Sequence, residues 1–238
     1  MTTHLGTLNT FSWMDLKTHD IPGTAAFFSA VLGWDFAVDE QDWRSATTAT
    51  LDGQRIATVS DLANPIYPPG TPAHIAYYLA VQDVDRRAEA AMAHGARLIL
   101  APFDAGDQGR VATLIDPAGA AFSLWRPAER SGWNFAQAIA SAPQRMVLAC
   151  PDPGQAERFY RRMLDAPLPC ADFVPAPGPA AVSTPQWELA VGAADLDQVA
   201  DGVRAAGQAS ITRLEGAHKP YLRLRSPQGL TLLVGPVA

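Results

Sequence analysis

Four segments of this chain share one pattern, and this internal repeat constrains the fold more than any other feature. Each segment contains a short alternating strand, an Asp, an amphipathic helix and further strands. The first and third begin at Ser12 (SWMDLKTHDIPGTAAFFSAVLGW) and Arg145 (RMVLACPDPGQAERFYRRMLDAP). The second and fourth begin at His74 (HIAYYLAVQDVDRRAEAAMAHGA) and Trp187 (WELAVGAADLDQVADGVRAAGQA). The repeat predicts an α+β protein built from four related modules.

The ends of the predicted helices carry the expected chemistry. Asp20 and Asp152 stand where a side-chain oxygen can accept hydrogen bonds from the free N–H groups of a helix start. Gly95 and Gly207 follow the helices of the second and fourth segments, where a left-handed cap favours glycine. The sequence DPAG at Asp116 predicts a turn that leads into a final strand.

Taken together, these motifs resemble the vicinal oxygen chelate superfamily, which includes glyoxalase I, bleomycin-resistance proteins and extradiol dioxygenases. The strand–Asp–Phe-Phe–Leu-Gly-Trp run and the tail GRVATLIDPAGAAFSLW carry the resemblance best. It implies βαβββ modules that pair into domains, each a curled mixed sheet with helices outside. The expected boundaries are a first domain at residues 8–127 with the ligand cup, a linker at 128–139, and a second, degenerate domain at 140–238.

The third segment departs from this pattern. Only 22 residues separate Leu164 from Trp187, and they include the run PAPGPAA. Proline cannot donate to a strand ladder and is kept out of central strands. We therefore expect the third module to have lost or shortened strands, which leaves the second cup incomplete.

The resemblance also implies where a metal would bind: His, Gln or Glu on the first strand of each module, and Glu on the last. In the first domain, counting back seven residues from the helix-start Asp gives Trp13 and Ala76, and the last-strand positions are near Ala57 and at Ser123. None of these is a typical ligand of a divalent ion. We therefore expect no metal and no other cofactor there.

In the second domain the corresponding residues are Arg145, Glu188 and Leu233, and we expect the fourth position to be lost. One carboxylate does not make a metal site. A displaced site that uses His74 and Asp15 remains an alternative, and it would make the protein a metal-dependent lyase or dioxygenase with shifted ligands.

Strand alternation predicts which side chains face the first cup. Asp15 and His74 are the expected catalytic acid–base pair. The expected substrate-binding residues are Trp13, Lys17, Tyr78, Arg110, Ser123 and Trp125. Aromatic walls with a few polar groups suit a planar or partly apolar small molecule.

Structural roles for the same residues stay open. The two tryptophans could be ordinary sheet packing, and Asp15 and Lys17 could be a structural pair. His74 could simply be solvated, Tyr78 could lie on a dimer face, and Arg110 could hold a loop, which is the role we favour for it.

Composition excludes several classes of function. The net charge of −6 and the scattered basic residues argue against a nucleic-acid partner. No apolar run reaches membrane-spanning length, and a hydrophobic content of 48% indicates a packed protein, so we expect a cytoplasmic chain. Cys150 and Cys170 fit no zinc or redox motif. Phosphate-loop, dinucleotide and serine-hydrolase motifs do not occur.

These observations favour a metal-independent acid–base enzyme of secondary metabolism that binds a small hydrophobic or aromatic metabolite, as in an isomerisation, cyclisation or elimination. A drug- or metabolite-sequestering protein without catalysis is the main alternative, and the second domain could be purely structural. The expected partner is a small-molecule ligand, and the chain is expected to be a monomer or homodimer.

Overall fold

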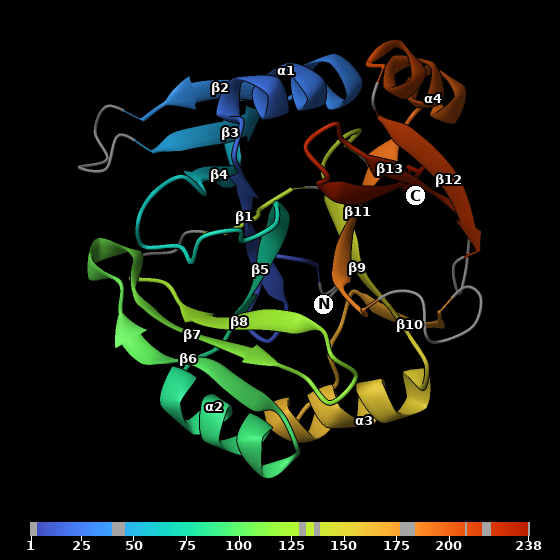
Figure 1. Cartoon of the computed structure of the whole chain (residues 1–238). Helices are drawn as coiled ribbons and strands as arrows, with labels where there is room; N and C mark the ends of the chain where they lie inside the picture. Colours follow the sequence, from blue (N-terminus) through green and yellow to red (C-terminus); the bar gives the residue numbers. More distant parts are fainter. Residues whose placement is uncertain are drawn as a thin grey trace. The chain divides into compact units, whose positions relative to one another are not determined.

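The computed structural model describes residues 4–39, 46–128, 132–135, 139–176, 184–207, 209–215 and 220–237 (Figure 1). Strands and helices alternate as the repeat predicted. In chain order the elements are β1 (Phe11–Thr18), α1 (Ile21–Leu32), β2 (Asp35–Val38), β3 (Thr47–Leu51), β4 (Gln54–Asp61), β5 (His74–Ala80), α2 (Val84–Ala93), β6 (Arg97–Asp104), a 3-10 turn (Gly106–Gln108), β7 (Arg110–Ile115), β8 (Ala121–Arg126), β9 (Pro143–Cys150), α3 (Pro153–Leu164), β10 (Ala171–Pro175), β11 (Trp187–Ala193), α4 (Leu196–Ala205), β12 (Ser210–Glu215), β13 (Pro220–Arg225) and β14 (Thr231–Pro236).

The strands form two mixed sheets, and the first, second and fourth modules have the same internal order. Their strands run β2–β3–β4–β1, β6–β7–β8–β5 and β12–β13–β14–β11. In each of them the last strand returns to pair in parallel with the first, as β4 does with β1, β8 with β5 and β14 with β11. These are three complete βαβββ modules, which confirms the α+β class predicted from the repeat.

The third module is shorter, as predicted, and its described strands are β9 and β10. β10 pairs in parallel with β9, from Ala171 opposite Met146 to Pro175 opposite Cys150. This is the place that the last strand takes in the complete modules. The expectation that the last-strand position was lost is therefore wrong. Among the described residues, the two middle strands are the ones that have no counterpart. The PAPGPAA run begins at the end of β10 and continues into residues outside the described part.

The chain divides into two compact units. Unit 1 comprises Met1–Trp13, Tyr77–Asn134 and Gln144–Leu189, and unit 2 comprises Met14–Ala76, Phe135–Pro143 and Ala190–Ala238. Unit 1 thus holds most of the second and third modules, with α2 beside α3 (Figure 1). Unit 2 holds most of the first and fourth modules, with α1 beside α4. Each unit combines one module from each predicted domain.

The helix ends follow the predicted chemistry. Asp20 and Asp152 each accept a hydrogen bond from a backbone N–H three residues on, at 2.9 and 2.8 Å. Gly95 and Gly207 have positive φ angles of 95° and 75°, which glycine adopts without a steric penalty. Among the described residues, no helix is both long and apolar enough to cross a membrane.

A buried polar network joins the two modules of unit 1. The Tyr160 hydroxyl on α3 donates to Asp116 Oδ2 at 2.9 Å and accepts from Trp187 Nε1 at 2.7 Å. Phe122 on β8 packs edge-on against Tyr160, with the ring centroids 5.3 Å apart. Burial raises the pKa of the Asp116 carboxyl, although the Ala120 N–H bond opposes the shift. The network fixes α3 against the helix-facing side of β8.

Unit 2 is closed by contacts between its own modules. Trp34, fully buried at the end of the first helix, donates from Nε1 to the Ser141 carbonyl at 3.0 Å. Gln228, in the turn before β14, donates to the carboxylate of the helix-start Asp20 at 3.1 Å. The cap of the first module is therefore also a contact with the fourth.

Candidate functional site

One face of the sheet run β5–β8–β7–β6 in unit 1 is the first candidate surface. Partners on neighbouring strands share a face, as do residues two apart on one strand. The register places two cross-strand rows on this face: Tyr78, Ser123, Thr113 and Leu100 in one, and Ala80, Trp125, Val111 and Phe103 in the other. We call these eight residues the apolar face.

Irregular pairing in β6 brings Leu100 and Phe103 onto this face together. Residues three apart in a regular strand point to opposite sides. The register between β6 and β7 shifts between Leu98 and Leu100 and again between Leu100 and Phe103, and a bulge reverses the alternation. Both side chains therefore lie beside Thr113 and Val111.

The apolar face leaves hydrophobic side chains uncovered. Leu100 is 46% exposed and Phe103 is 41% exposed, whereas Trp125 in the middle of the face is 5% exposed. The Tyr78 and Trp125 rings meet edge to face, with centroids 6.1 Å apart. Trp125 Nε1 donates to the Gln108 carbonyl at 2.7 Å, which holds the indole ring in this buried position.

A pair of hydroxyls supplies the polar group of this face. Ser123 Oγ and Thr113 Oγ1 are 2.9 Å apart, and either can be the donor. One proton lies between the two oxygens, which leaves the second hydroxyl proton for another acceptor. Ser123 is buried and Thr113 is half-buried, so the pair can orient a ligand without making the face polar.

The opposite side of the same sheet faces the helix layer. Phe122, next in sequence to Ser123, packs against Phe159 and Tyr160 of α3. This arrangement agrees with the strand alternation that placed Ser123 and Trp125 on the face away from the helices.

Asp15 and Lys17 belong to a different cluster, in unit 2. Lys17 Nζ lies 2.8 Å from Asp15 Oδ2, and Ser60 Oγ lies 2.9 and 2.8 Å from the two Asp15 carboxylate oxygens. The side chains of Asp15 and Lys17 are only 8% and 14% exposed. Lys17 also donates to the Tyr67 hydroxyl at 2.9 Å. We call Asp15, Lys17, Ser60 and Tyr67 the polar cluster.

The structure places His74 and Asp15 in different surroundings. His74 is exposed at the start of β5, and its Nδ1 lies 2.8 Å from the Pro72 carbonyl. Because a carbonyl only accepts, Nδ1 carries the proton, and Nε2 of the neutral ring remains an acceptor. No contact between the described atoms of His74 and Asp15 joins the two side chains.

Arg110 lies on the helix side of unit 1, opposite the apolar face. Its guanidinium binds Asp85 through Nε at 2.6 Å and Nη2 at 2.7 Å, and Nη1 lies 3.2 Å from Asp104. The hydrogen bonds from Arg110 hold the pKa of the Asp85 carboxyl below its usual range. These contacts fit the structural role favoured from the sequence. Trp13, also in unit 1, is half-buried on β1.

The register also locates the residues that correspond to the family's metal positions. In the second module the last-strand position Ser123 lies opposite Tyr78, two residues after Ala76. In the first module, the residue two positions after Trp13 is Asp15, and Thr58 lies opposite it. The last-strand position is therefore Thr58 and not the expected Ala57. In the third module the same offset gives Asp172, opposite Val147.

The residues at these positions do not fit a divalent ion. The first domain offers an indole, a methyl group and two hydroxyls, from Trp13, Ala76, Thr58 and Ser123. In the third module, Arg145 Nε and Nη2 bind both oxygens of the buried Asp172 carboxylate, at 2.9 and 2.6 Å. A guanidinium therefore occupies the oxygens that a cation would use. Among the described residues, no group of three His, Cys, Asp or Glu side chains could hold a metal ion.

The two cysteines do not offer a reactive thiolate. Burial raises the pKa of the Cys150 thiol to about 11, and it also raises the pKa of Cys170. Both groups are therefore protonated at neutral pH, which disfavours nucleophilic chemistry.

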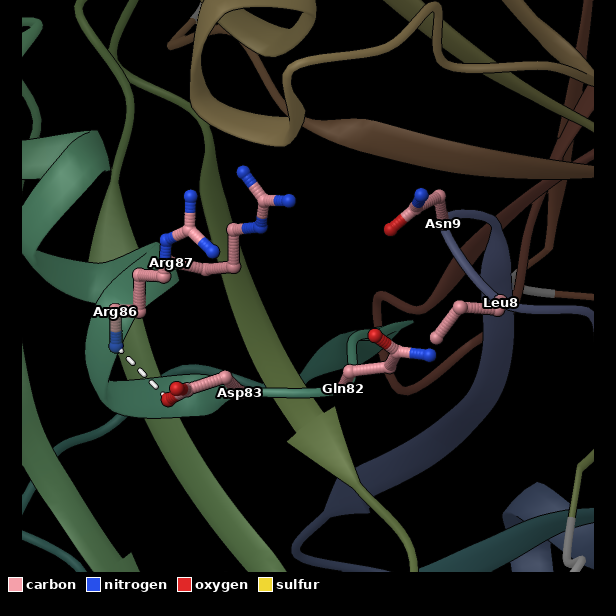
Figure 2. A pocket seen from close by; sticks show the side chains of 6 residues that line it. All are labelled: Leu8, Asn9, Gln82, Asp83, Arg86 and Arg87. Carbon is pink, nitrogen blue, oxygen red and sulfur yellow. Dashed lines mark hydrogen bonds between the residues drawn. The ribbon is translucent and has the colours of Figure 1, made fainter.

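A small polar pocket lies at the start of α2 in unit 1. Figure 2 shows its lining: Leu8, Asn9, Gln82, Asp83, Arg86 and Arg87. Asp83 caps the helix by accepting from the Arg86 backbone N–H, and Arg87 donates to the Met163 carbonyl at 2.9 Å. Its volume of about 70 Å³ is far below the few hundred Å³ of a typical ligand pocket. We therefore do not assign the metabolite to it.

Sequence reasoning missed three of the most relevant side chains. Leu100 and Phe103 escaped because simple alternation places them on opposite faces; Pro102 between them was the available sign of an irregular strand. Tyr67 escaped because it lies between β4 and β5, where no periodic pattern indicates its direction.

Comparison with known proteins shows which proteins the chain is similar to. Residues 13–125 match the model of the glyoxalase-like domain family. A Mn(II)-bound glyoxalase from Novosphingobium aromaticivorans has a similar structure, with a TM-score of 0.58 over 95% of this chain and 81% of that one, at 15% identity. At that identity the likeness concerns the fold. The chain therefore shares the fold of this glyoxalase, and residues 13–125 are similar to a glyoxalase-like domain, in agreement with the resemblance seen in its motifs.

Two curated relatives are closer in sequence. The anthracycline biosynthesis protein DauV of Streptomyces sp. (strain C5) is 29% identical over 189 residues, which cover 75% of this chain and 66% of that protein. The putative glyoxylase CFP32 of Mycobacterium bovis is 32% identical over 117 residues, or 48% of this chain and 44% of that protein. The matched parts thus span between under half and about two thirds of these relatives.

Proposed function

We propose that this chain binds a small hydrophobic or aromatic metabolite of secondary metabolism and catalyses a metal-independent proton transfer on it, as in an isomerisation, cyclisation or elimination. The observation that carries the binding part is the apolar face of unit 1. Its exposed Leu100 and Phe103 adjoin Thr113 and Val111, while the Ser123–Thr113 hydroxyl pair supplies one polar contact. Uncovered apolar area of this kind on a rigid sheet favours a flat, apolar ligand.

The relatives support the ligand class. DauV is named as an anthracycline biosynthesis protein. Anthracyclines are polycyclic aromatic compounds, and an aromatic ring system matches the shape and chemistry of a face built from Tyr78, Trp125 and Phe103. We therefore propose a polycyclic aromatic ketone or a close derivative as the ligand of this chain.

The acid–base part rests on the polar cluster and on His74. Asp15 is buried beside a cation, and His74 exposes an imidazole nitrogen that can accept a proton. A base of either kind can remove a proton next to a ketone, and a neighbouring donor can stabilise the enolate oxygen that forms. The residues at the metal positions that the resemblance implies do not fit a divalent ion, so the proposed proton transfer uses side chains alone.

The proposed proton transfer can be measured without the natural substrate. The protein is incubated with 1-tetralone, an aromatic ketone, in deuterium oxide, and mass spectrometry follows deuterium entering the carbon next to the carbonyl. We expect exchange above the uncatalysed rate, and we expect it to fall in both Asp15→Asn and His74→Ala. Exchange at the uncatalysed rate, together with tight binding of the ketone, contradicts catalysis and leaves a binding protein.

A binding protein without catalysis is the second candidate. The observation that favours it is that Asp15 is already engaged, since the single hydroxyl proton of Ser60 lies within reach of both carboxylate oxygens and one oxygen also contacts Lys17. Oxygens that already hold hydrogen bonds are less available to take a proton from a ligand. The exchange experiment separates the two candidates directly.

A further inference from the structure

The donor and acceptor roles in the polar cluster of unit 2 determine where the Tyr67 hydroxyl proton can point. An ammonium group can only donate hydrogen bonds. The bond of 2.9 Å between Lys17 Nζ and the Tyr67 hydroxyl therefore fixes the Tyr67 oxygen as the acceptor. The Tyr67 proton must point elsewhere. Among the described residues, no acceptor for that proton is found.

The same cluster makes the Tyr67 hydroxyl a stronger donor than an ordinary phenol. Its oxygen accepts from a cation, and hydrogen bonds polarise one another along a chain. The Lys17 ammonium also lies 4.6 Å from the centre of the Tyr67 ring. Asp15 holds that ammonium in place from the other side, at 2.8 Å. Besides its proposed acid–base role, Asp15 thus holds Lys17 where its ammonium can polarise the phenol.

The segment that carries Tyr67 is held by its own hydrogen bonds. The Tyr67 N–H donates to the Asn64 carbonyl at 3.0 Å, and the Asn64 side chain accepts from the Ile66 N–H at 3.1 Å. The segment is tied to β1 where the Leu62 N–H donates to the Thr18 carbonyl at 2.8 Å. Farther along, the His19 ring lies 2.8 Å from the Thr71 carbonyl. Tyr67 is half-buried, and its hydroxyl is held by Lys17.

We propose that the Tyr67 hydroxyl is the ligand-facing donor of the polar cluster and that it takes a carbonyl or enolate oxygen of the metabolite. The inference rests on the proposed function and names the chemical group that the ligand must carry. A donor that is already polarised by a cation is suited to an oxygen that gains negative charge, because it is in place before the charge develops. An aromatic hydrocarbon without such an oxygen gains nothing from Tyr67.

A matched pair of probes tests the proposal. Fluorenone and fluorene have the same tricyclic shape and differ by a carbonyl in place of a methylene group. Dissociation constants of both are measured for the wild type, for Tyr67→Phe and for Ile66→Ala. Tyr67→Phe keeps the ring beside the ammonium and removes only the hydroxyl. Ile66, its neighbour in the same segment, is 76% exposed and serves as the control.

We expect the wild type and Ile66→Ala to prefer fluorenone by about tenfold, the size of one hydrogen bond in a charged setting. Tyr67→Phe should bind both probes with the affinity that the wild type has for fluorene. The infrared carbonyl stretch of bound fluorenone should shift to lower frequency in the wild type and return toward its free value in Tyr67→Phe, which a merely structural tyrosine would not cause.

The outcomes distinguish this inference from the proposed function. Equal affinity of the wild type for the two probes, or an unchanged preference in Tyr67→Phe, overturns the role of Tyr67 while aromatic binding stands. A wild type that binds neither probe contradicts the proposed function and overturns the inference with it.

Discussion

The first and second modules have the same element order, the same parallel closure of first and last strands and the same Asp at the helix start, yet their sheets present different chemistry. In the second module the described face is apolar, with Leu100 and Phe103 uncovered beside Thr113 and Val111. In the first, the positions on β1 and β4 carry Asp15, Lys17 and Ser60. The helix-facing residues and caps specify the module, and the other face is free to differ. Each of the following experiments tests one side of that difference.

The largest effect should come from the polar side. Asp15→Asn keeps the size of the side chain and removes the charge that holds Lys17. We expect the rate of deuterium exchange into 1-tetralone to fall about 100-fold, which lies within the usual range for loss of acid–base catalysis. The affinity for fluorene should stay within about twofold. Mass spectrometry and a fluorescence titration measure the two quantities, and a parallel loss of both would mean that the two faces do not differ in function.

The next effect concerns the support behind the apolar face. Tyr160→Phe leaves Trp187 Nε1 and Asp116 Oδ2 without their buried partner. We expect a loss of about 2 to 3 kcal/mol in the free energy of unfolding, since unsatisfied buried groups are costly. Urea denaturation of the whole chain measures it. A loss below about 0.5 kcal/mol would show that α3 is held mainly by its apolar contacts.

A smaller effect should arise on the apolar face itself. Phe103→Ala removes exposed apolar area, and we expect fluorene to bind about tenfold more weakly, with little change in stability. Val38→Ala is the matched control, because Val38 is 56% exposed on the edge strand β2 of unit 2. If the two variants weaken fluorene binding equally, exposed apolar side chains in general, and not this face, bind the probe.

The smallest effect on binding is expected for Arg110→Gln. Arg110 lies on the helix side, so fluorene affinity should not change. Its loss should let the lowered pKa of Asp85 return upward to the usual range. The stabilisation from a lowered carboxyl pKa is present above the usual pKa of Asp and is lost as the pH falls through the lowered value. The variant should therefore lose less stability on acidification, and denaturation at pH 7 and in acid measures this.

The sequence predicted the parts of the molecule that depend on local chemistry. Caps at Asp20 and Asp152, glycines after the helices and the phase of β8 all follow from nearest-neighbour rules, and the structure agrees with them. The shortening of the third module followed from its prolines. Which strands are present among its described residues did not follow, because the parallel pairing of β10 with β9 depends on tertiary contacts.

The candidate site was predicted only in part, for the same reason. Alternation found Tyr78, Ser123 and Trp125, which lie on regular strands. It could not find Phe103, which depends on a bulge, or Tyr67, whose position depends on hydrogen bonds to residues of its own segment. The buried hydrogen bond between Tyr160 and Asp116 joins residues that are 44 positions apart, so no rule based on local sequence predicts it.

A crystal structure of the chain with bound fluorene tests most directly whether the apolar face is the ligand-binding surface. We expect the ring system of fluorene in van der Waals contact with Leu100 and Phe103, close to the Ser123–Thr113 hydroxyl pair. Fluorene bound elsewhere, with these two side chains still open to solvent, would contradict the assignment of the apolar face as the ligand-binding surface.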